Sequence, residues 1–550
     1  MRISVVTSLL AIVLPAFVQA QLGRTPQKFT LDDSLRGTLN ANRSWWDVQR
    51  YDITVTPDYT SETIVGQTSI RFSSSKPGKL MQIDLQQPLL IDSIVLNQHQ
   101  RISFTRKNNT ALLQMPAQMQ AGEHNLHIYY HGQPRKAIRA PWDGGWVWTK
   151  DNKGRPWMTV ACQGLGASVW YPCKDHQSDE PDLGASLTMI VPDTLTAVGN
   201  GRLTNKMPMG DKTAWRWEVK NPINNYNIIP YIGKYVSFEE QYNGEDGVLD
   251  CSYWVLDYEL EKAKEQFKQV KPMLQCFEHW FGPYPFYADG YKLVQSSHLG
   301  MEHQSAVAYG NNFMNGYRGR DLSGTGWGSK WDFIIIHESG HEWFGNNITS
   351  KDIADMWIHE GFTNYSETIY TQCLFGKAAG EAYVQGIRKN IMNDRPIIGE
   401  YGVNHEGSGD MYYKAANMIH TIRTAMQNDS SFRQLLRGMY KTFYHGTTST
   451  VELQAYMQQF LSFDVKAVFD QYLRTTQIPL LQWSINSGQL KVKFTDCNAA
   501  FRLPVYLPTS NGQGVWKTIQ ANEWTTIATS LNDENISSEW NKNLYIRYQD

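Results

Sequence analysis

The run IIIHESGHEWFGN at residues 334–346 constrains the fold more than any other part of the sequence. Its apolar start, followed by polar side chains four residues apart, is typical of a helix that enters a core. Residues four apart lie on one face of a helix, so His337 and His341 can offer two imidazoles to one metal ion. Glu338 projects about 100° away from His337 and can approach a water beside the ion without binding the ion. The short motif alone is a weak signal.

A catalytic zinc ion needs three protein ligands and one open position. Glu360 follows His341 with eighteen residues between them, a gap that fits a turn and a second helix. This longer spacing is far more specific than the short motif, and it predicts one zinc ion per chain bound by His337, His341 and Glu360. The alternative is that these are ordinary polar side chains. The apolar residues before His337 would then bury unpaired charges at a cost in free energy.

The chain of 550 residues is too long for a single core, and its pattern changes twice. Up to about residue 238, short alternating runs are separated by turn clusters, which indicates antiparallel β structure. Helical spacing then dominates until alternation returns after about residue 478. We predict a multidomain α+β protein with an N-terminal antiparallel β domain (21–238), a mainly helical metal-binding domain (239–478) and a small C-terminal β domain (479–550).

Residues 1–20 have the composition of a cleavable leader. Arg2 precedes the apolar stretch 5–18, and the VQA that ends at Ala20 is a small-x-small cleavage site. We predict export to a periplasm or to the medium, with a mature chain that begins at Gln21. No later run is long and apolar enough to serve as a membrane anchor. The net charge of −2 gives no reason to expect nucleic acid as a partner.

Six cysteines are few for an exported chain and do not form the disulfide framework of a small secreted domain. No C-x-x-C metal spacing occurs. Cys162 and Cys173 could form a disulfide, but the favoured interpretation is two buried thiols.

Several motifs together resemble the aminopeptidase N family of gluzincin metallopeptidases, which includes leukotriene-A hydrolase. The similarity covers nearly the whole of the chain after the leader, and the motifs fall in the family's order. They are CQGLGASVWYPCKD (162–175), FGPYPF (281–286), GMEHQS (300–305), HESGHEWFGNNIT (337–349), MWIHEGFTNYSE (356–367) and YYKAA (412–416).

The resemblance implies the roles of the catalytic residues. Glu338 is expected to be the general base, which takes a proton from the zinc-bound water and later gives it to the leaving amine. Tyr412 matches the family's transition-state tyrosine and is expected to donate to the developing oxyanion. It is followed by Tyr413 and Lys414, and Ala415 stands where the family has glycine.

The resemblance also implies how the substrate is held. Glu302 is expected to pair with the free α-ammonium of a peptide, so that only the first peptide bond reaches the metal. Gly300 and Met301 belong to the same motif and are assigned to substrate binding. Gln163, from the β domain, is expected to reach the same ammonium and to line the first side-chain pocket.

This chain departs from the family's G-x-M-E-N pattern at both ends. Leu299 and His303 stand where the family has Gly and Asn, which puts the main-chain geometry around Glu302 in question.

Two further carboxylates lie near the ligands in sequence. Glu367 and Asp355 either orient the zinc ligands from behind or lie on a solvated helix face.

The predicted function is an exported, zinc-dependent aminopeptidase that acts on peptides with a free N-terminus. An endopeptidase of the thermolysin type is the second enzyme hypothesis, and the eighteen-residue spacing and Glu302 argue against it. A third is an inactive homologue that serves as a binding module. Such chains usually lose a ligand or the general base, and His337, Glu338, His341 and Glu360 are all present. Epoxide hydrolysis has no specific support in the sequence.

The fold that the resemblance implies is an antiparallel β domain, a thermolysin-like catalytic domain and a short C-terminal β-sandwich. The large helical C-terminal domain of many relatives has no room here, because only about seventy residues follow residue 478. Oligomeric state is not predicted.

Overall fold

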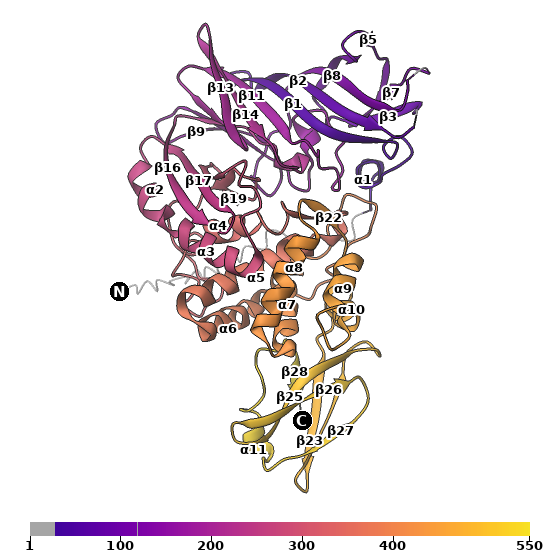
Figure 1. Ribbon diagram of the computed structural model, residues 1–550, viewed down its shortest axis with the longest axis vertical. Helices are drawn as coiled ribbons and strands as arrows, with labels where there is room; N and C mark the ends of the chain where they lie inside the picture. The colour runs from indigo at the N-terminus through magenta and orange to yellow at the C-terminus, as the bar shows by residue number, and fades with distance from the viewer. Residues whose placement is uncertain (1–27, 77, 118, 550) are drawn as a thin grey trace, which may run out of the picture.

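A computed structural model describes residues 28–549, apart from residues 77 and 118. Three parts follow one another along the long axis of the molecule (Figure 1). A β-rich part lies at the top, a mainly helical part lies in the middle, and a small β part lies at the bottom. The predicted leader, residues 1–20, lies outside the described residues.

The β-rich part is built on an eight-stranded sheet. Its strands show the burial alternation of a sheet with one face on a core, as in β2, where every second residue is buried. In spatial order the strands are β13 (Arg202–Met209), β14 (Lys212–Val219), β11 (Ala185–Pro192), β1 (Trp46–Asp58), β2 (Thr63–Ser74), β8 (Gly122–Gly132), β4 (Leu90–Leu96) and β5 (Gln100–Arg101).

Neighbouring strands of this sheet are antiparallel, as predicted, with one exception. β1 and β11 run parallel, with Tyr51 opposite Ala185 and Val55 opposite Met189. A parallel pair needs a long crossover connection, and strands β2 to β10 lie between these two strands in sequence. The smaller sheets of this part contain β9 (Gly145–Lys150), β10 (Pro156–Ala161), β12 (Thr196–Val198) and β15 (Tyr231–Gly233), and β3 (Leu80–Asp84), β6 (Phe104–Lys107) and β7 (Thr110–Gln114).

A mixed five-stranded sheet begins the mainly helical middle part, which contains the predicted catalytic residues and is called the catalytic part from here on. Its spatial order is β16 (Tyr235–Gly244), β17 (Gly247–Leu256), β18 (Tyr291–Gln295), β20 (Val307–Tyr309) and β19 (Gly300–Met301). β19 is therefore an edge strand, and Met301 packs into the hydrophobic cluster of the β-rich part. The domain boundaries near residues 238 and 478 stay predictions, and the first falls inside β16.

Helices make up the rest of the middle part. The α-helices are α2 (Leu260–Gln266), α3 (Val270–Phe281), α4 (Phe333–Gly340), α5 (Trp357–Phe375), α6 (Lys377–Gly386), α7 (Tyr413–Met426), α8 (Asp429–Thr442), α9 (Thr450–Gln458) and α10 (Val465–Arg474), with α1 (Leu31–Gly37) and α11 (Asp533–Ile536) outside this part. The 3-10 helices of this part are η3 (Phe267–Gln269), η4 (Ile353–Asp355), η5 (Ile387–Asn390) and η6 (Gly409–Met411), and the β-rich part contains η1 (Ala167–Val169) and η2 (Asn225–Asn227). A short parallel pair joins β21 (Ile348–Ser350) to β22 (Gly446–Thr448).

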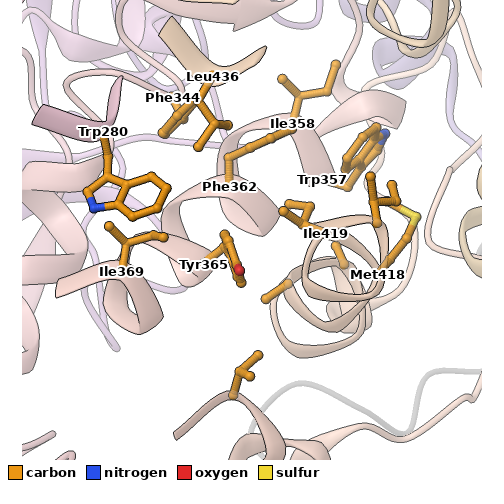
Figure 2. Close-up of a cluster of buried hydrophobic side chains, with 14 of the residues drawn as sticks. Trp280, Phe344, Trp357, Ile358, Phe362, Tyr365, Ile369, Met418, Ile419 and Leu436 are labelled. Carbon is orange, nitrogen blue, oxygen red and sulfur yellow. The ribbon is translucent and has the colours of Figure 1, made fainter. Parts of the chain in front are cut away.

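Helix α5 lies at the centre of the catalytic core. All of its residues from Trp357 to Thr371 are buried. Figure 2 shows Phe362 and Tyr365 of α5 among side chains from neighbouring helices, including Ile419 of α7 and Leu436 of α8. A helix that is buried on all sides carries its polar side chains into the core with it. The carboxylates of α5 therefore need buried partners.

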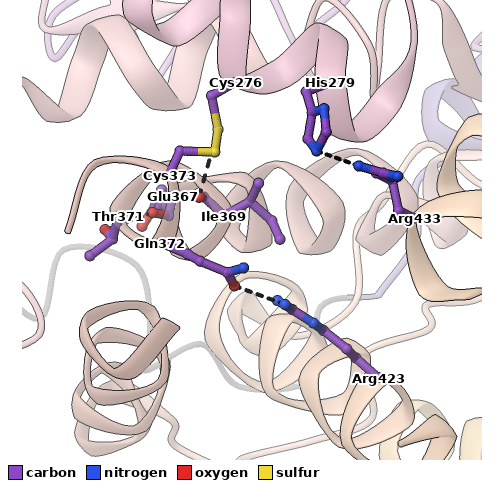
Figure 3. Close-up of a disulfide and its surroundings, with 9 residues drawn as sticks. All are labelled: Cys276, His279, Glu367, Ile369, Thr371, Gln372, Cys373, Arg423 and Arg433. Carbon is purple, nitrogen blue, oxygen red and sulfur yellow. Dashed lines mark hydrogen bonds between the residues drawn. A yellow bond between two sulfur atoms is a disulfide. The ribbon is translucent and has the colours of Figure 1, made fainter. Parts of the chain in front are cut away.

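A disulfide between Cys276 and Cys373 ties α3 to α5 (Figure 3). The two cysteines are 97 residues apart in sequence, and no local spacing predicts their pairing. Cys162 and Cys173 are both free and buried, as the favoured interpretation had it.

The C-terminal part is the small β unit that alternation predicts. It contains a four-stranded sheet and a two-stranded sheet, and its buried side chains continue the catalytic core. The strands are β27 (Thr525–Ala528), β24 (Gln489–Thr495), β23 (Leu480–Asn486) and β28 (Arg547–Gln549), and β25 (Arg502–Ser510) and β26 (Gln513–Gln520). Among the described residues, none of the helices has the length and apolar character needed to cross a membrane.

Candidate metal centre and substrate site

Helix α4 brings the first two candidate ligands into the core. Asp332 caps its start, accepting hydrogen bonds from the backbone N–H groups of Ile334 (3.0 Å) and Ile335 (3.4 Å). His341 is the C-cap residue, but its φ of −64° and ψ of −20° are still helical. His337 and His341 are thus one turn apart on the same face, as predicted.

Glu360 of α5 completes a compact set of donors. Its Oε2 lies 3.6 Å from His337 Nε2 and 3.3 Å from His341 Nε2. Ligand atoms about 2.0–2.2 Å from a zinc ion at tetrahedral angles are about 3.3–3.5 Å apart. Glu360 Oε2 is also buried without a hydrogen-bond partner among the described residues. The three side chains therefore fit a zinc ion.

A second group of possible ligands shares His341 with the first. Glu302 and Glu338 lie close enough to His341 for their donor atoms to fall within 4.8 Å of one another. We assign the metal to the first group, because both of its histidines are oriented by a contact at Nδ1, which leaves Nε2 for the metal.

His337 is oriented by a carboxylate of the same helix that carries Glu360. Glu367 Oε1 lies 2.7 Å from His337 Nδ1 and is itself held by Asn364 Nδ2 (2.8 Å). Tyr383 Oη donates to the other carboxylate oxygen at 2.6 Å. A carboxylate on Nδ1 leaves Nε2 free to bind a metal. Glu367 thus has the orienting position that was one of its two expected alternatives.

His341 is oriented by the backbone instead. Its Nδ1 lies 3.0 Å from the carbonyl oxygen of Phe344. Asp355 bonds to neither histidine: it accepts from the backbone N–H of Thr450 at 3.0 Å and from Tyr401 Oη at 2.8 Å. Neither expected alternative for Asp355 is met: its side chain is buried, not solvated, and η4 directs its carboxylate to the start of α9 instead of to a zinc ligand.

Glu338 lies beside the ligands but is not one of the first set. It is 8% exposed, and burial raises the pKa of its carboxyl to about 7 against the opposing effect of His337 and His341. The edge strand β19 passes directly in front of it. A Cβ atom added to Gly300 would lie 2.6 Å from Glu338 Oε1, so only glycine allows this approach.

Glu302 faces the same space from the end of β19. It is 2% exposed, and burial raises the pKa of its carboxyl. Gln163 Nε2 donates to Glu302 Oε1 across the junction between the β-rich and catalytic parts. Tyr226 Oη donates to the same oxygen at 3.1 Å. The structure thus brings Gln163 and Glu302 together, although 139 residues separate them in sequence.

The two departures around Glu302 leave this arrangement in place. His303 is fully buried, and its Nδ1 lies 2.5 Å from Tyr231 Oη. Burial lowers the pKa of His303 well below its usual value, so the imidazole is neutral. Leu299 packs into the catalytic core, and its carbonyl oxygen accepts from Gly310 N at 2.7 Å.

Tyr412 is the tyrosine on the metal side of α7. Its ring centroid is 6.1 Å from that of His337. Burial and then the charge of Glu360 raise the pKa of the Tyr412 phenol well above its usual value. Burial and then the charge of Glu367, on the far side of His337, raise the pKa of Tyr413. The arrangement therefore favours Tyr412 over Tyr413 for contact with a reacting group.

Two residues that hold Glu302 were missed by the sequence analysis. Tyr226 lies in a stretch without a recognisable motif. Asn346 donates from Nδ2 to the carbonyl oxygen of Glu302 at 2.7 Å. Asn346 lies in the same motif as the histidines, and its position in that motif could have indicated a role at the site.

Residues 265–472 match the Peptidase family M1 domain, and residues 48–226 match the Peptidase M1 N-terminal domain. The chain belongs to peptidase family M1. Zinc is the cofactor of this M1 peptidase, as predicted, and the donor set described above fits it.

Curated relatives of this M1 peptidase are aminopeptidases. Aminopeptidase B of Mus musculus is 24% identical over 366 residues, which is 62% of this chain and 53% of the relative. Aminopeptidase Ey of Gallus gallus is 25% identical over 274 residues, which is 46% of this chain and 26% of the relative. The match to this chain spans about half or less of the length of these relatives.

A solved structure shares the fold. The M1 zinc metallopeptidase of Deinococcus radiodurans superposes with a TM-score of 0.65 at 19% identity, covering 80% of this chain and 96% of that one. The same enzyme, in a mutant form, was solved with a bound Tyr-Ser-Ala substrate. The similarity confirms the predicted order of a β-rich N-terminal domain and a helical catalytic domain.

Removing the carboxylate behind His337 is expected to weaken zinc binding. We expect Glu367→Ala to lower zinc affinity about 10- to 100-fold, because the imidazole loses the contact that sets its orientation and tautomer. Competition with a chromophoric chelator measures this directly. Glu381→Gln, on the neighbouring helix α6, removes a charge without touching a ligand and should leave the affinity unchanged. An unchanged affinity in Glu367→Ala would contradict the orienting role.

Proposed function

We propose that this protein is a zinc-dependent aminopeptidase that hydrolyses the first peptide bond of peptides with a free N-terminus. The observation that carries the proposal is the place of Glu302, a buried carboxylate next to the metal ligands at the end of an edge strand. A carboxylate there fixes the distance from a substrate ammonium to the metal, so that only the bond next to the N-terminus is within reach.

Strand β19 offers the substrate backbone a place to bind. It pairs with β20 on one side, and its other edge is unpaired within the sheet. An extended peptide can add to such an edge through main-chain hydrogen bonds. The close approach of Gly300 to Glu338 then directs the bound backbone past the general base.

Glu302 and Gln163 together close the end of the site that binds the N-terminus of the peptide. The α-ammonium has three protons to donate, and Glu302 and the amide oxygen of Gln163 are acceptors at one end of the site. A charge-assisted contact of this kind is stronger than a neutral hydrogen bond. A substrate that extends beyond its N-terminal residue in this direction would meet these side chains.

Glu338 moves the proton. Its carboxylate takes a proton from the attacking water and delivers it to the nitrogen of the leaving amine. A zinc ion on His337, His341 and Glu360 would supply Lewis acidity, lowering the pKa of water and polarising the scissile carbonyl. Tyr412 is placed beside the ligands to donate its phenolic O–H to the oxyanion that develops.

An acetylated N-terminus should protect a peptide from this enzyme. Acetylation removes the positive charge and adds bulk at Glu302 and Gln163, so the free peptide should lose residues one at a time while its acetylated twin stays intact. Mass spectrometry of both digests over time measures the difference. Internal cleavage of the acetylated peptide at a comparable rate would instead indicate a thermolysin-like endopeptidase. Failure to cleave either peptide in the presence of zinc would indicate a binding module.

Glu302→Gln is the matched variant for the same experiment. It keeps the size and the hydrogen bond to Gln163 but removes the charge that attracts the ammonium. We expect a higher KM and a lower kcat on the free peptide, because the contact both binds the substrate and sets its distance to the metal.

Tyr412 and Tyr413 should respond differently to loss of the hydroxyl. We expect Tyr412→Phe to lower kcat by about 100-fold with little change in KM, since the contact forms only as the oxyanion develops. Tyr413→Phe is the control and should be mild. Steady-state kinetics on an aminoacyl reporter separates the two, and the reverse result would show that the register is wrong by one residue.

We further propose that the protein is exported. The predicted leader supports this, and so does the disulfide between Cys276 and Cys373, since structural disulfides persist mainly in oxidising compartments. Expression of the full sequence in a secreting host should yield a mature N-terminus at Gln21, which N-terminal sequencing measures. A product that retains residues 1–20 and stays in the cytoplasm would contradict export.

A further inference from the structure

The segment 399–408 bridges the two large parts of the molecule beside the candidate site. Asn404 N donates to the carbonyl oxygen of Asp33 (3.0 Å), and Asn404 Nδ2 donates to that of Gly164 (2.8 Å). On the catalytic side, Gly402 N donates to Asp352 Oδ2 at 2.9 Å. The segment is thus held from both sides, and a side chain that it directs inward has a defined position.

Glu406 is an acidic side chain of this segment that lies against the β-rich part. Gly164, next to Gln163 in sequence, lies opposite it: a Cβ atom added to Gly164 would be 3.4 Å from Glu406 Oε1. Burial, together with smaller contributions from the charges of Glu360 and Glu302, raises the pKa of the Glu406 carboxyl to about 7. Glu406 therefore lies beside the segment that carries Gln163.

The carboxylate of Glu406 has no hydrogen-bond or ion-pair partner in the part of the chain that the structure describes. The charge of Arg395 lowers the pKa of Glu406, an effect smaller than that of burial. The Arg395 guanidinium donates to the carbonyl oxygen of Gly407 at 2.9 Å instead. A half-buried carboxylate in this state gains more from a cationic partner than one in bulk water does.

The other carboxylates around the site already have partners or an assigned ion. Glu360 belongs to the metal group, and Glu302 accepts from Gln163 and Tyr226. In the proposed reaction the α-ammonium of the substrate pairs with the Glu302 carboxylate. Glu406 is then a second carboxyl group, next to the Gln163–Gly164 backbone that is expected to line the first side-chain pocket.

We propose that Glu406 is a specificity-determining residue, which forms the acidic end of the first side-chain pocket and selects peptides that begin with arginine or lysine. This inference rests on the proposed aminopeptidase function and adds the substrate class to it. A substrate with two cationic groups, the α-ammonium and the side chain, would engage Glu302 and Glu406 at the same time. An uncharged N-terminal residue would leave the Glu406 carboxylate unpaired.

Arginine and citrulline reporters provide the test, because their side chains have nearly the same shape and differ in charge. The wild-type zinc enzyme should hydrolyse the arginine reporter with a kcat/KM about 10- to 100-fold above that of the citrulline reporter. Glu406→Gln should bring the two within a few-fold of each other, mainly by lowering the value for arginine. Glu400→Gln removes the same charge from an exposed position of the same segment and should keep the wild-type ratio.

Two outcomes would overturn the assignment of Glu406. One is a wild-type enzyme that does not distinguish arginine from citrulline. The other is an equal loss on all reporters in Glu406→Gln, which would place Glu406 with Glu302 in binding the ammonium.

A binding measurement separates this inference from the proposed function. Calorimetry on the zinc-loaded Glu338→Gln protein compares free L-arginine with free L-citrulline and needs no turnover. A preference for arginine that disappears in the Glu338→Gln, Glu406→Gln double variant would support the pocket even if no reporter is cleaved. Equal affinities for the two amino acids would overturn the pocket even if the aminopeptidase activity is present.

Discussion

The arrangement of the catalytic part depends on charge that is buried in its core. Helix α5 is buried along most of its length and carries two carboxylates, Glu360 and Glu367, next to the imidazoles of His337 and His341. Burying a carboxylate in such a place costs several kcal/mol of folding free energy unless it has a partner. Glu367 pairs with His337, Asn364 contributes a hydrogen bond to it, and a metal ion is what remains for Glu360 to bind.

The substrate end of the site depends on a different constraint, the packing of the β-rich part against β19. Met301 lies in the core of the β-rich part, while Glu302 beside it faces the metal ligands. Because side chains alternate along a strand, anchoring one residue in a core turns its neighbour the other way. Gln163, from the β-rich part, can then reach Glu302, so the site is complete only when the two parts are docked.

Much of the fold and of the metal centre was accessible from spacing. Alternation and helical periodicity identified the three parts in order, and the helix around His337 was expected from its apolar entry. Contacts between distant segments were not accessible. The parallel pairing of β1 with β11, the disulfide at Cys276 and the position of Asp355 each depend on which elements pack together. Local sequence patterns do not identify such partners, because the free energy of these contacts arises only when distant segments pack together.

The sequence by itself determined the chemistry of the donors: two histidines one helical turn apart and a glutamate at a fixed distance beyond them, with Glu338 between. Helical geometry converts that spacing into a common face, so no long-range information is needed. Only the tertiary structure decided which acids meet at the proposed substrate end of the site. Glu302 and Glu406 come from an edge strand and a loop that meet at the junction of the two parts, and Gly164 lies against Glu406 only after docking. The physical reason is that electrostatic selection depends on distance in space, which chain separation does not encode.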